Sequence, residues 1–184
     1  MMPYAAMWCE ENIWQRVRAL APDLAGRHVV FISNAHRSVA CWSQRAAAPG
    51  EAVIWDYHVV SLTVSAAGAT IDDPDCTAGE SLPFAAWCHA TFPRGDAVPD
   101  DLRPRFRVAP AAWYLDDFTS DRSHMRGPDG AWLAPPPPWA PPRPGRLGAP
   151  THTLPAWWDV THEDPSRGFT CDLNQLSRFA TCPG

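Results

Sequence analysis

The sequence contains no lysine, and all 15 of its basic side chains are arginines. These arginines are mixed with 20 acidic residues, so the chain has a net charge of −5 and no basic stripe. Because nucleic-acid binding depends on clustered positive charge, we expect no nucleic-acid partner. No run of 18 or more apolar residues is present, and we therefore expect no transmembrane segment and no membrane partner.

The sequence also lacks the spacing of a structural metal site. It has no CxxC or HxxxH pair, and Cys88 and His89 are adjacent, which is poor spacing for chelation. We therefore expect neither a metal nor another cofactor. Six cysteines occur at irregular spacing in a chain larger than most disulfide-stapled scaffolds. Since the first residues also lack the regions of a signal peptide, we expect a soluble cytoplasmic protein with reduced thiols.

What the sequence does have is the composition of a folded protein, with 46% hydrophobic residues and 10 tryptophans among 184 residues. This length suits one domain over residues 1–184. A helical pattern followed by several strand patterns and then mixed elements predicts an α+β fold with a largely antiparallel sheet. The low-complexity segment "APPPPWAPPRPG", at about 134–145, is expected to form a rigid surface loop. An SH3-type docking motif is the alternative.

Local patterns predict the individual elements. Helical periodicity or capping indicates helices that begin near Cys9, follow Ser81 over 82–92, and span 109–118 and 172–180. β-Branched and apolar runs indicate strands at 27–33, 38–44, 52–64 and 105–108, with a further strand leading into 70–75. We expect 27–33 and 38–44 to pair as a hairpin, and 52–64 to be one buried central strand.

Cys9 lies where an amphipathic helix is predicted to begin. The apolar residues of 13–20 follow the helical period, and Glu10 and Glu11 suit the positive end of the helix dipole. Unpaired backbone N–H groups at such a helix start can stabilise a thiolate and lower the thiol pKa. The alternative is a small buried hydrophobic residue, which is the usual role of a free cysteine.

His58 interrupts the predicted central strand and has acids nearby. Asp56 lies two residues before it on the same face. A two-residue turn at 66–67 would pair Val60 with Asp73 and place Asp73 diagonal to His58, whereas a three-residue loop would reverse its face. A helix-start cysteine, a histidine and a carboxylate are the parts of a thiol triad. A hydrogen-bonded core histidine is the alternative.

Seven blocks of the sequence resemble, in the same order, the protein N-terminal glutamine amidohydrolase family. They are "WCEENIW" (8–14), "FISN" (31–34), "VIWDYHVV" (53–60), "LPF" (82–84), "FRV" (106–108), "SDRSHM" (120–125) and "PPPPW" (135–139). The resemblance extends from Tyr4 to about Phe179. It implies an enzyme that converts N-terminal glutamine to glutamate and releases ammonia, an early step in N-degron degradation. It also implies an α-β-α sandwich with a papain- or transglutaminase-like core, acting as a monomer.

The resemblance further implies the catalytic residues. The cysteine of the family's Cys-Glu-Glu-Asn-Ile-Trp block is here Cys9, and the histidine of its Trp-Asp-Tyr-His block is His58. The family's Tyr-Asp-Leu-Asp stretch matches 72–75 and makes Asp73 the third member. The sequence departs there, since Asp72 replaces the tyrosine and a proline follows the acid. Asp56 therefore remains the alternative third member.

A substrate with a free N-terminus also presents an α-ammonium group, which calls for acidic or carbonyl partners. The candidates by type are Glu10, Glu11, Asp56 and Asp121. For Asp121 the alternative is a turn cap or a pair with Arg122. Two other functions remain open: another thiol enzyme, such as a transglutaminase or protease, and a non-enzymatic module that binds through the proline-rich loop.

Overall fold

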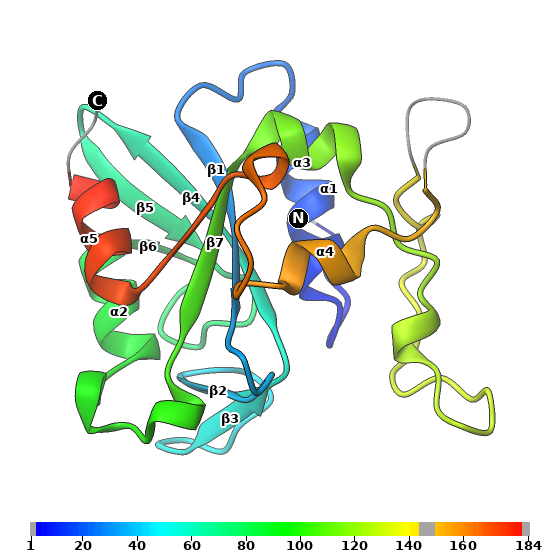
Figure 1. Ribbon diagram of the computed structural model, residues 1–184, viewed down its shortest axis with the longest axis horizontal. Coiled ribbons are helices and arrows are strands. Elements are labelled where there is room, and N and C mark those ends of the chain that lie inside the picture. Colours follow the sequence, from blue (N-terminus) through cyan, green and yellow to red (C-terminus); the bar gives the residue numbers. More distant parts are fainter. Residues whose placement is uncertain (1–2, 144–149, 182–184) are drawn as a thin grey trace.

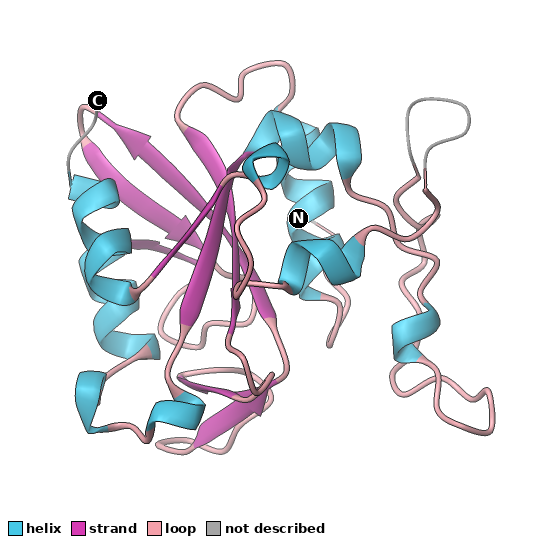
Figure 2. Ribbon diagram, in the orientation of Figure 1, coloured by secondary structure: helices cyan, strands magenta, loops and turns pink. Residues whose placement is uncertain are grey.

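The computed structural model describes residues 3–143 and 150–181, which form a three-layered α+β fold (Figures 1 and 2). Every strand pair in it is antiparallel, and six strands form the main sheet in the order β6-β5-β4-β1-β7-β8. The strands of this sheet are β1 (Arg27–Ser33), β4 (His58–Ser65), β5 (Gly68–Asp72), β6 (Ser81–Pro83), β7 (Arg105–Pro110) and β8 (Phe169–Cys171). The α+β, largely antiparallel architecture expected from the sequence is confirmed.

Helices cover both faces of this sheet (Figure 1). They are α1 (Cys9–Leu20), α2 (Phe84–Thr91), α3 (Ala111–Asp117), α4 (Leu154–Trp158) and α5 (Leu173–Thr181). The alternation of β1 shows why two layers form: Val30 and Ile32 pack toward α2 and α5, whereas Val29 and Phe31 pack toward α1, α3 and α4. No helix in the described part of the chain is both long and apolar enough to cross a bilayer.

Several predicted elements are confirmed. Helix α1 begins at Cys9, with Trp8 as its N-cap residue, and β1 has the predicted bounds. The C-terminal helix α5 buries Leu176 and Ala180. Of the proline-rich segment, residues 144 and 145 lie outside the described residues, as does Cys182.

The predicted hairpin between 27–33 and 38–44 is wrong. Strand β2 (Val39–Trp42) pairs with β3 (Ala52–Trp55) in a separate two-stranded sheet. The side chain of Asn34 explains the change of direction. It accepts hydrogen bonds from the backbone N–H groups of His36 and Ser38 and donates to the carbonyl of Asp101, so the chain turns away from the main sheet.

The predicted strand 52–64 is also wrong as one element, because it is divided into β3 and β4. At the break, the carboxylate of Asp56 accepts the N–H of Tyr57 at 2.9 Å, and Ser33 Oγ donates to the Asp56 carbonyl at 2.6 Å. These side-chain hydrogen bonds compete with ladder hydrogen bonds at the break. Asp56 and His58 therefore do not share one continuous strand face.

The helix predicted over 82–92 begins later. Residues 81–83 form the edge strand β6, which pairs with β5, and α2 starts only at Phe84. A proline is tolerated at such an edge because it has no N–H to donate. Ser81 is therefore a strand residue and not the predicted helix cap.

Candidate active site

Cys9 is the first residue of α1, and the residue is 8% exposed. The indole of the preceding Trp8 is fully buried and donates to the carbonyl of Pro135 at 2.9 Å. This bond ties the helix start to the proline-rich segment. The N–H groups of the first helical turn have no partner within the helix, so they point toward the end where the thiol lies.

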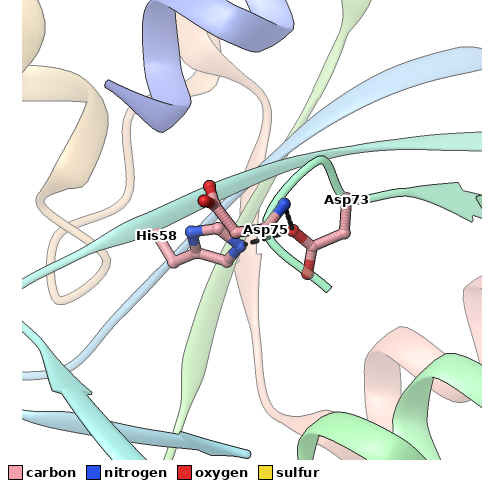
Figure 3. A group of neighbouring side chains, drawn as sticks. All are labelled: His58, Asp73 and Asp75. Atoms are coloured by element: carbon pink, nitrogen blue, oxygen red, sulfur yellow. Dashed lines mark hydrogen bonds and ion pairs between the residues drawn. The ribbon is translucent and has the colours of Figure 1, made fainter. Parts of the chain in front are cut away.

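His58 and Asp73 form a buried pair (Figure 3). His58 Nε2 lies 2.9 Å from Asp73 Oδ1, and both side chains are 1% exposed. His58 is the first residue of β4, and Asp73 directly follows β5. The strands pair Ser61 with Asp72 across a two-residue turn at 66–67. Of the two registers that the sequence left open, the structure has the one that brings Asp73 toward His58.

The carboxylate of Asp73 accepts three further hydrogen bonds. Oδ1 receives the N–H of Asp75 at 3.1 Å, and Oδ2 receives Trp87 Nε1 at 3.1 Å and Gln44 Nε2 at 3.2 Å. Burial by itself raises the pKa of Asp73, but His58, Trp87 and Gln44 together lower it below its usual value. Asp73 is therefore an ionised, rigidly held partner for the imidazole.

Trp55 stacks on the face of the His58 imidazole. The two rings stack with centroids 5.8 Å apart and an interplanar angle of 13°. Burial lowers the pKa of His58, but the charge and hydrogen bond of Asp73 outweigh it and leave the pKa raised. Nδ1 of His58 is buried and has no hydrogen-bond partner within residues 3–143 and 150–181. This nitrogen is free to accept or donate a proton.

Burial raises the pKa of the Cys9 thiol well above its ordinary value, and Glu10 and Asp75 raise it further. The lowered pKa expected from the helix start is therefore wrong for this structure, because desolvation outweighs a backbone hydrogen bond from Val59. The thiol donates to Glu10 Oε2 at 3.6 Å. A neutral thiol needs a base before it can act as a nucleophile.

Cys9 lies in the wall of a cavity of about 370 Å³. The polar side chains that share this wall are Asp56, Tyr57, Asp75 and His124, and the rest of it is mostly apolar, formed by Met7, Val53, Ile54, Trp55, Met125 and Leu133. A small apolar cavity with a few polar groups is typical of a ligand site. The cavity joins the start of α1, the β3–β4 connection and the segment that follows α3.

His58, Asp73 and Asp75 also have the spacing of a metal site, since one ligand atom of each lies within 4.8 Å of the others (Figure 3). His58 Nε2 and Asp73 Oδ1 are already joined by a hydrogen bond of 2.9 Å. A metal bound through them would break that bond. The donor set therefore fits proton transfer better than metal binding.

Comparison with known proteins identifies the family to which this chain belongs. A family model described as N-terminal glutamine amidase matches residues 4–180. This chain belongs to the N-terminal glutamine amidase family. The protein N-terminal glutamine amidohydrolase of Drosophila pseudoobscura pseudoobscura is 39% identical over 148 residues, covering 75% of this chain and 70% of the relative. That of Homo sapiens is 38% identical over 141 residues, covering 74% of this chain and 69% of the relative.

The acids predicted to contact the substrate lie in different places in this member of the family. Asp56 lines the cavity, but its side chain is 54% exposed and pairs with Arg37 at 2.7 Å. Glu10 is fully buried behind Cys9, and its Oε1 lies 3.4 Å from His124 Nε2. The structure thus brings Asp56 to the cavity and Glu10 to the nucleophile.

Glu11 and Asp121 are directed elsewhere. Glu11 is fully buried, and its two oxygens accept Arg122 Nε and Nη2, each at 2.7 Å, while Trp139 Nε1 donates to Oε2 at 2.8 Å. Arg122 therefore pairs with Glu11, so the pair with Asp121 is wrong, whereas the turn cap that was the other alternative for Asp121 is confirmed. Asp121 accepts the N–H of Ser123 and lies 3.1 Å from His152 Nδ1. Neither acid lines the cavity.

Four further side chains, for which the sequence predicted no role, contact the His58–Asp73 pair or line the cavity. Trp55 stacks on His58, Gln44 and Trp87 hold Asp73, and Asp75 faces the cavity. Only Trp55 and Asp75 had a local signal, since they lie within or next to the blocks around His58 and Asp73. Gln44 and Trp87 come from separate elements, and nothing in their neighbourhood marks them.

Proposed function

We propose that this chain is a cysteine amidohydrolase that converts the N-terminal glutamine of proteins and peptides to glutamate and releases ammonia. Membership of the N-terminal glutamine amidase family supports the substrate. The observation that carries the mechanism is the buried His58–Asp73 pair next to a cavity that contains Cys9. We assign Cys9 as nucleophile, His58 as general base and acid, and Asp73 as the carboxylate that orients the imidazole.

The reaction begins with a proton transfer. Because the raised pKa keeps Cys9 neutral, the unpartnered Nδ1 of His58 takes the thiol proton as sulfur attacks the side-chain amide carbon. The free N–H groups at the start of α1 stabilise the oxyanion that forms. His58 then returns the proton to the leaving nitrogen, the C–N bond breaks, and ammonia departs. A thioester between Cys9 and the glutamyl side chain remains.

Water completes the cycle. His58, again neutral, takes a proton from a water molecule that attacks the thioester carbonyl, and the C–S bond breaks. The glutamate side chain is released, and the sulfur recovers its proton from His58. Asp73 accepts the hydrogen bond from the Nε2–H group throughout, without taking the proton, and so keeps Nδ1 available for each transfer.

The finer expectations of the family belong to the same proposal. We infer a papain- or transglutaminase-like core, since helix, histidine strand and acid strand supply the three groups in that order. We also propose a monomeric, cytoplasmic, single-domain enzyme whose product enters an N-degron route. Trp8 donates to the carbonyl of Pro135, and Trp139, within the proline-rich segment, donates to the buried Glu11. These two bonds support a structural role for that segment, in place of partner docking.

Four peptides test the function. Ammonia release is measured for a peptide that begins with glutamine, its N-acetylated form, a peptide with glutamine second, and a peptide that begins with asparagine. We expect turnover of the first and almost none of the others, because a site built for a charged group rejects analogues without it by about 10⁴-fold. The asparagine peptide should be a poor substrate because its side chain is one methylene shorter, so its amide carbon does not reach the sulfur.

A second readout separates this function from transglutamination. Mass spectrometry after addition of a primary amine should show only the glutamate product, with no incorporated amine. Equal rates on the free and acetylated peptides, or incorporation of the amine, would show that a transglutaminase-like activity is the correct assignment.

A further inference from the structure

One carboxylate in the cavity has no part in the mechanism above. Asp75 is 4% exposed and lines the cavity together with Cys9. Its backbone is held on both sides, since its N–H donates to Asp73 and its carbonyl accepts the N–H of Arg45 at 2.8 Å. Figure 3 shows its carboxylate beside the imidazole of His58. A rigid acid is therefore presented next to the reacting groups.

The hydrogen bonds of Asp75 leave one oxygen available. Tyr4 Oη donates to Oδ1 at 2.7 Å, and no donor among the described residues contacts Oδ2. Burial raises the pKa of Asp75 above its usual value, although His58 and Tyr4 act in the opposite direction. A buried carboxylate of this kind is stabilised when a cation arrives to pair with it.

The substrate brings such a cation into the cavity. In a glutaminyl N-terminus the α-nitrogen is four bonds from the amide carbon, so the two atoms are at most about 5 Å apart. When Cys9 attacks that carbon, the α-ammonium must lie close to the sulfur. The rival acid, Asp56, is less suited, because Arg37 and the N–H of Tyr57 already use its two oxygens.

We propose that Asp75 binds the substrate α-ammonium and thereby prevents the thioester from cyclising, an inference that rests on the proposed function. A free α-amine of the acyl group can attack its own thioester carbonyl through a five-membered ring. The new N–C bond forms, the C–S bond breaks, Cys9 leaves as thiolate, and the amine proton returns to it. The product is a pyroglutamyl peptide in place of the glutamyl peptide. An ammonium held by a carboxylate has no lone pair and cannot make this attack.

The test uses Asp75→Asn, which keeps the shape of the side chain and removes its charge. Mass spectrometry separates the products, since the pyroglutamyl peptide has one water less than the glutamyl peptide. Wild-type enzyme should give glutamyl product alone, and the variant should give a substantial pyroglutamyl fraction. Reactions without enzyme and with Cys9→Ala correct for spontaneous cyclisation.

A second substrate measures recognition apart from cyclisation. A peptide whose first residue is glutamine without its α-amine cannot cyclise, and wild type should reject it strongly. Asp75→Asn should reduce the ratio of kcat/KM between the two peptides by about 10²–10³-fold, as expected when one partner of a buried charge pair is removed. Asp56→Asn is the matched comparison, and it should keep the wild-type product ratio.

The outcomes are distinct. A folded Asp75→Asn enzyme that makes only glutamyl product, with an unchanged preference for the α-amine, overturns the inference, and so does pyroglutamyl product from Asp56→Asn. If circular dichroism shows that Asp75→Asn does not fold, Tyr4→Phe is tested in its place. It should give a smaller increase of the pyroglutamyl product. An unchanged product ratio and an unchanged preference for the α-amine would then refute the role of Asp75. Absence of ammonia release by wild type would instead refute the proposed function.

Discussion

Replacement of Asp73 by asparagine is the perturbation that best isolates the catalytic geometry. Asp73 accepts four N–H groups, from His58 and Asp75 on one oxygen and from Gln44 and Trp87 on the other. Asparagine has the same shape but one acceptor oxygen and one NH₂ group. The NH₂ group of the asparagine must therefore face either His58 and Asp75 or Gln44 and Trp87, and all four of these groups donate to Asp73.

Each orientation has a definite cost. If the NH₂ group faces His58, the imidazole must accept it at Nε2, so the proton moves to Nδ1 and the N–H of Asp75 loses its acceptor. If the NH₂ group faces the other pair, Gln44 can turn its unpartnered Oε1 toward it, but Trp87 Nε1 is left without an acceptor. In both cases one buried donor is unsatisfied, which costs about 1–3 kcal/mol of stability.

The catalytic loss is larger than the loss of stability. With the proton on Nδ1, His58 cannot accept the thiol proton of Cys9, and in the other orientation it loses its negative partner. The equivalent change in a serine-protease triad lowers turnover by about 10⁴-fold, or about 5 kcal/mol in the activation free energy. Loss of the Asp73 charge also removes the largest cause that raises the pKa of His58. Only the smaller effects of Asp75 and Glu10 then oppose burial, so the pKa should fall.

Ammonia release as a function of pH, together with urea unfolding, checks these expectations. Asp73→Asn should stay folded and lose turnover by about 10⁴-fold. Its remaining activity should fall on the acid side at a lower pH than that of wild type. Asp72→Asn, on the neighbouring residue of β5, is the matched control and should retain turnover. If Asp56→Asn costs more turnover than Asp73→Asn, the assignment of the third catalytic residue is wrong.

Three further outcomes are expected. Cys9→Ala should abolish turnover while the protein stays folded, and substantial activity in that variant would exclude the thiol mechanism. Wild-type activity should rise with pH through a His58 pKa above its ordinary value of about 6.5, because the proton-free Nδ1 is the active form; an acid limb well below that value would contradict this role. Glu11→Gln leaves the buried guanidinium of Arg122 without its charge partner and should lower the free energy of unfolding by about 3–5 kcal/mol, measured in urea. Glu80→Gln removes a half-exposed carboxylate that pairs with Arg16 and Arg45 and should cost less than about 1 kcal/mol. Equal losses in the two variants would show that the Glu11 pair does not stabilise the fold.

The sequence by itself determined those features that depend on neighbouring residues. Helix α1 begins at Cys9, β1 spans 27–33 and α5 follows 172, because periodicity and capping act over a few consecutive residues. The order of seven short blocks, from the one around Cys9 to the one at 135–139, was enough to indicate the family that the comparisons show. The bounds of these elements and the family can both be read from the order of residues along the chain.

Only the tertiary structure decided how distant residues meet. The turn at 66–67 could have had two or three residues, and that one-residue difference decides whether Asp73 faces His58, because strand faces alternate with a period of two. Asp56 separated from His58 because its carboxylate bonded locally to Tyr57 and broke the strand. Glu11 pairs with Arg122, 111 residues away, and therefore does not line the cavity. Residues so far apart in the sequence meet only when the whole core is packed. No pattern of neighbouring residues therefore predicts these contacts.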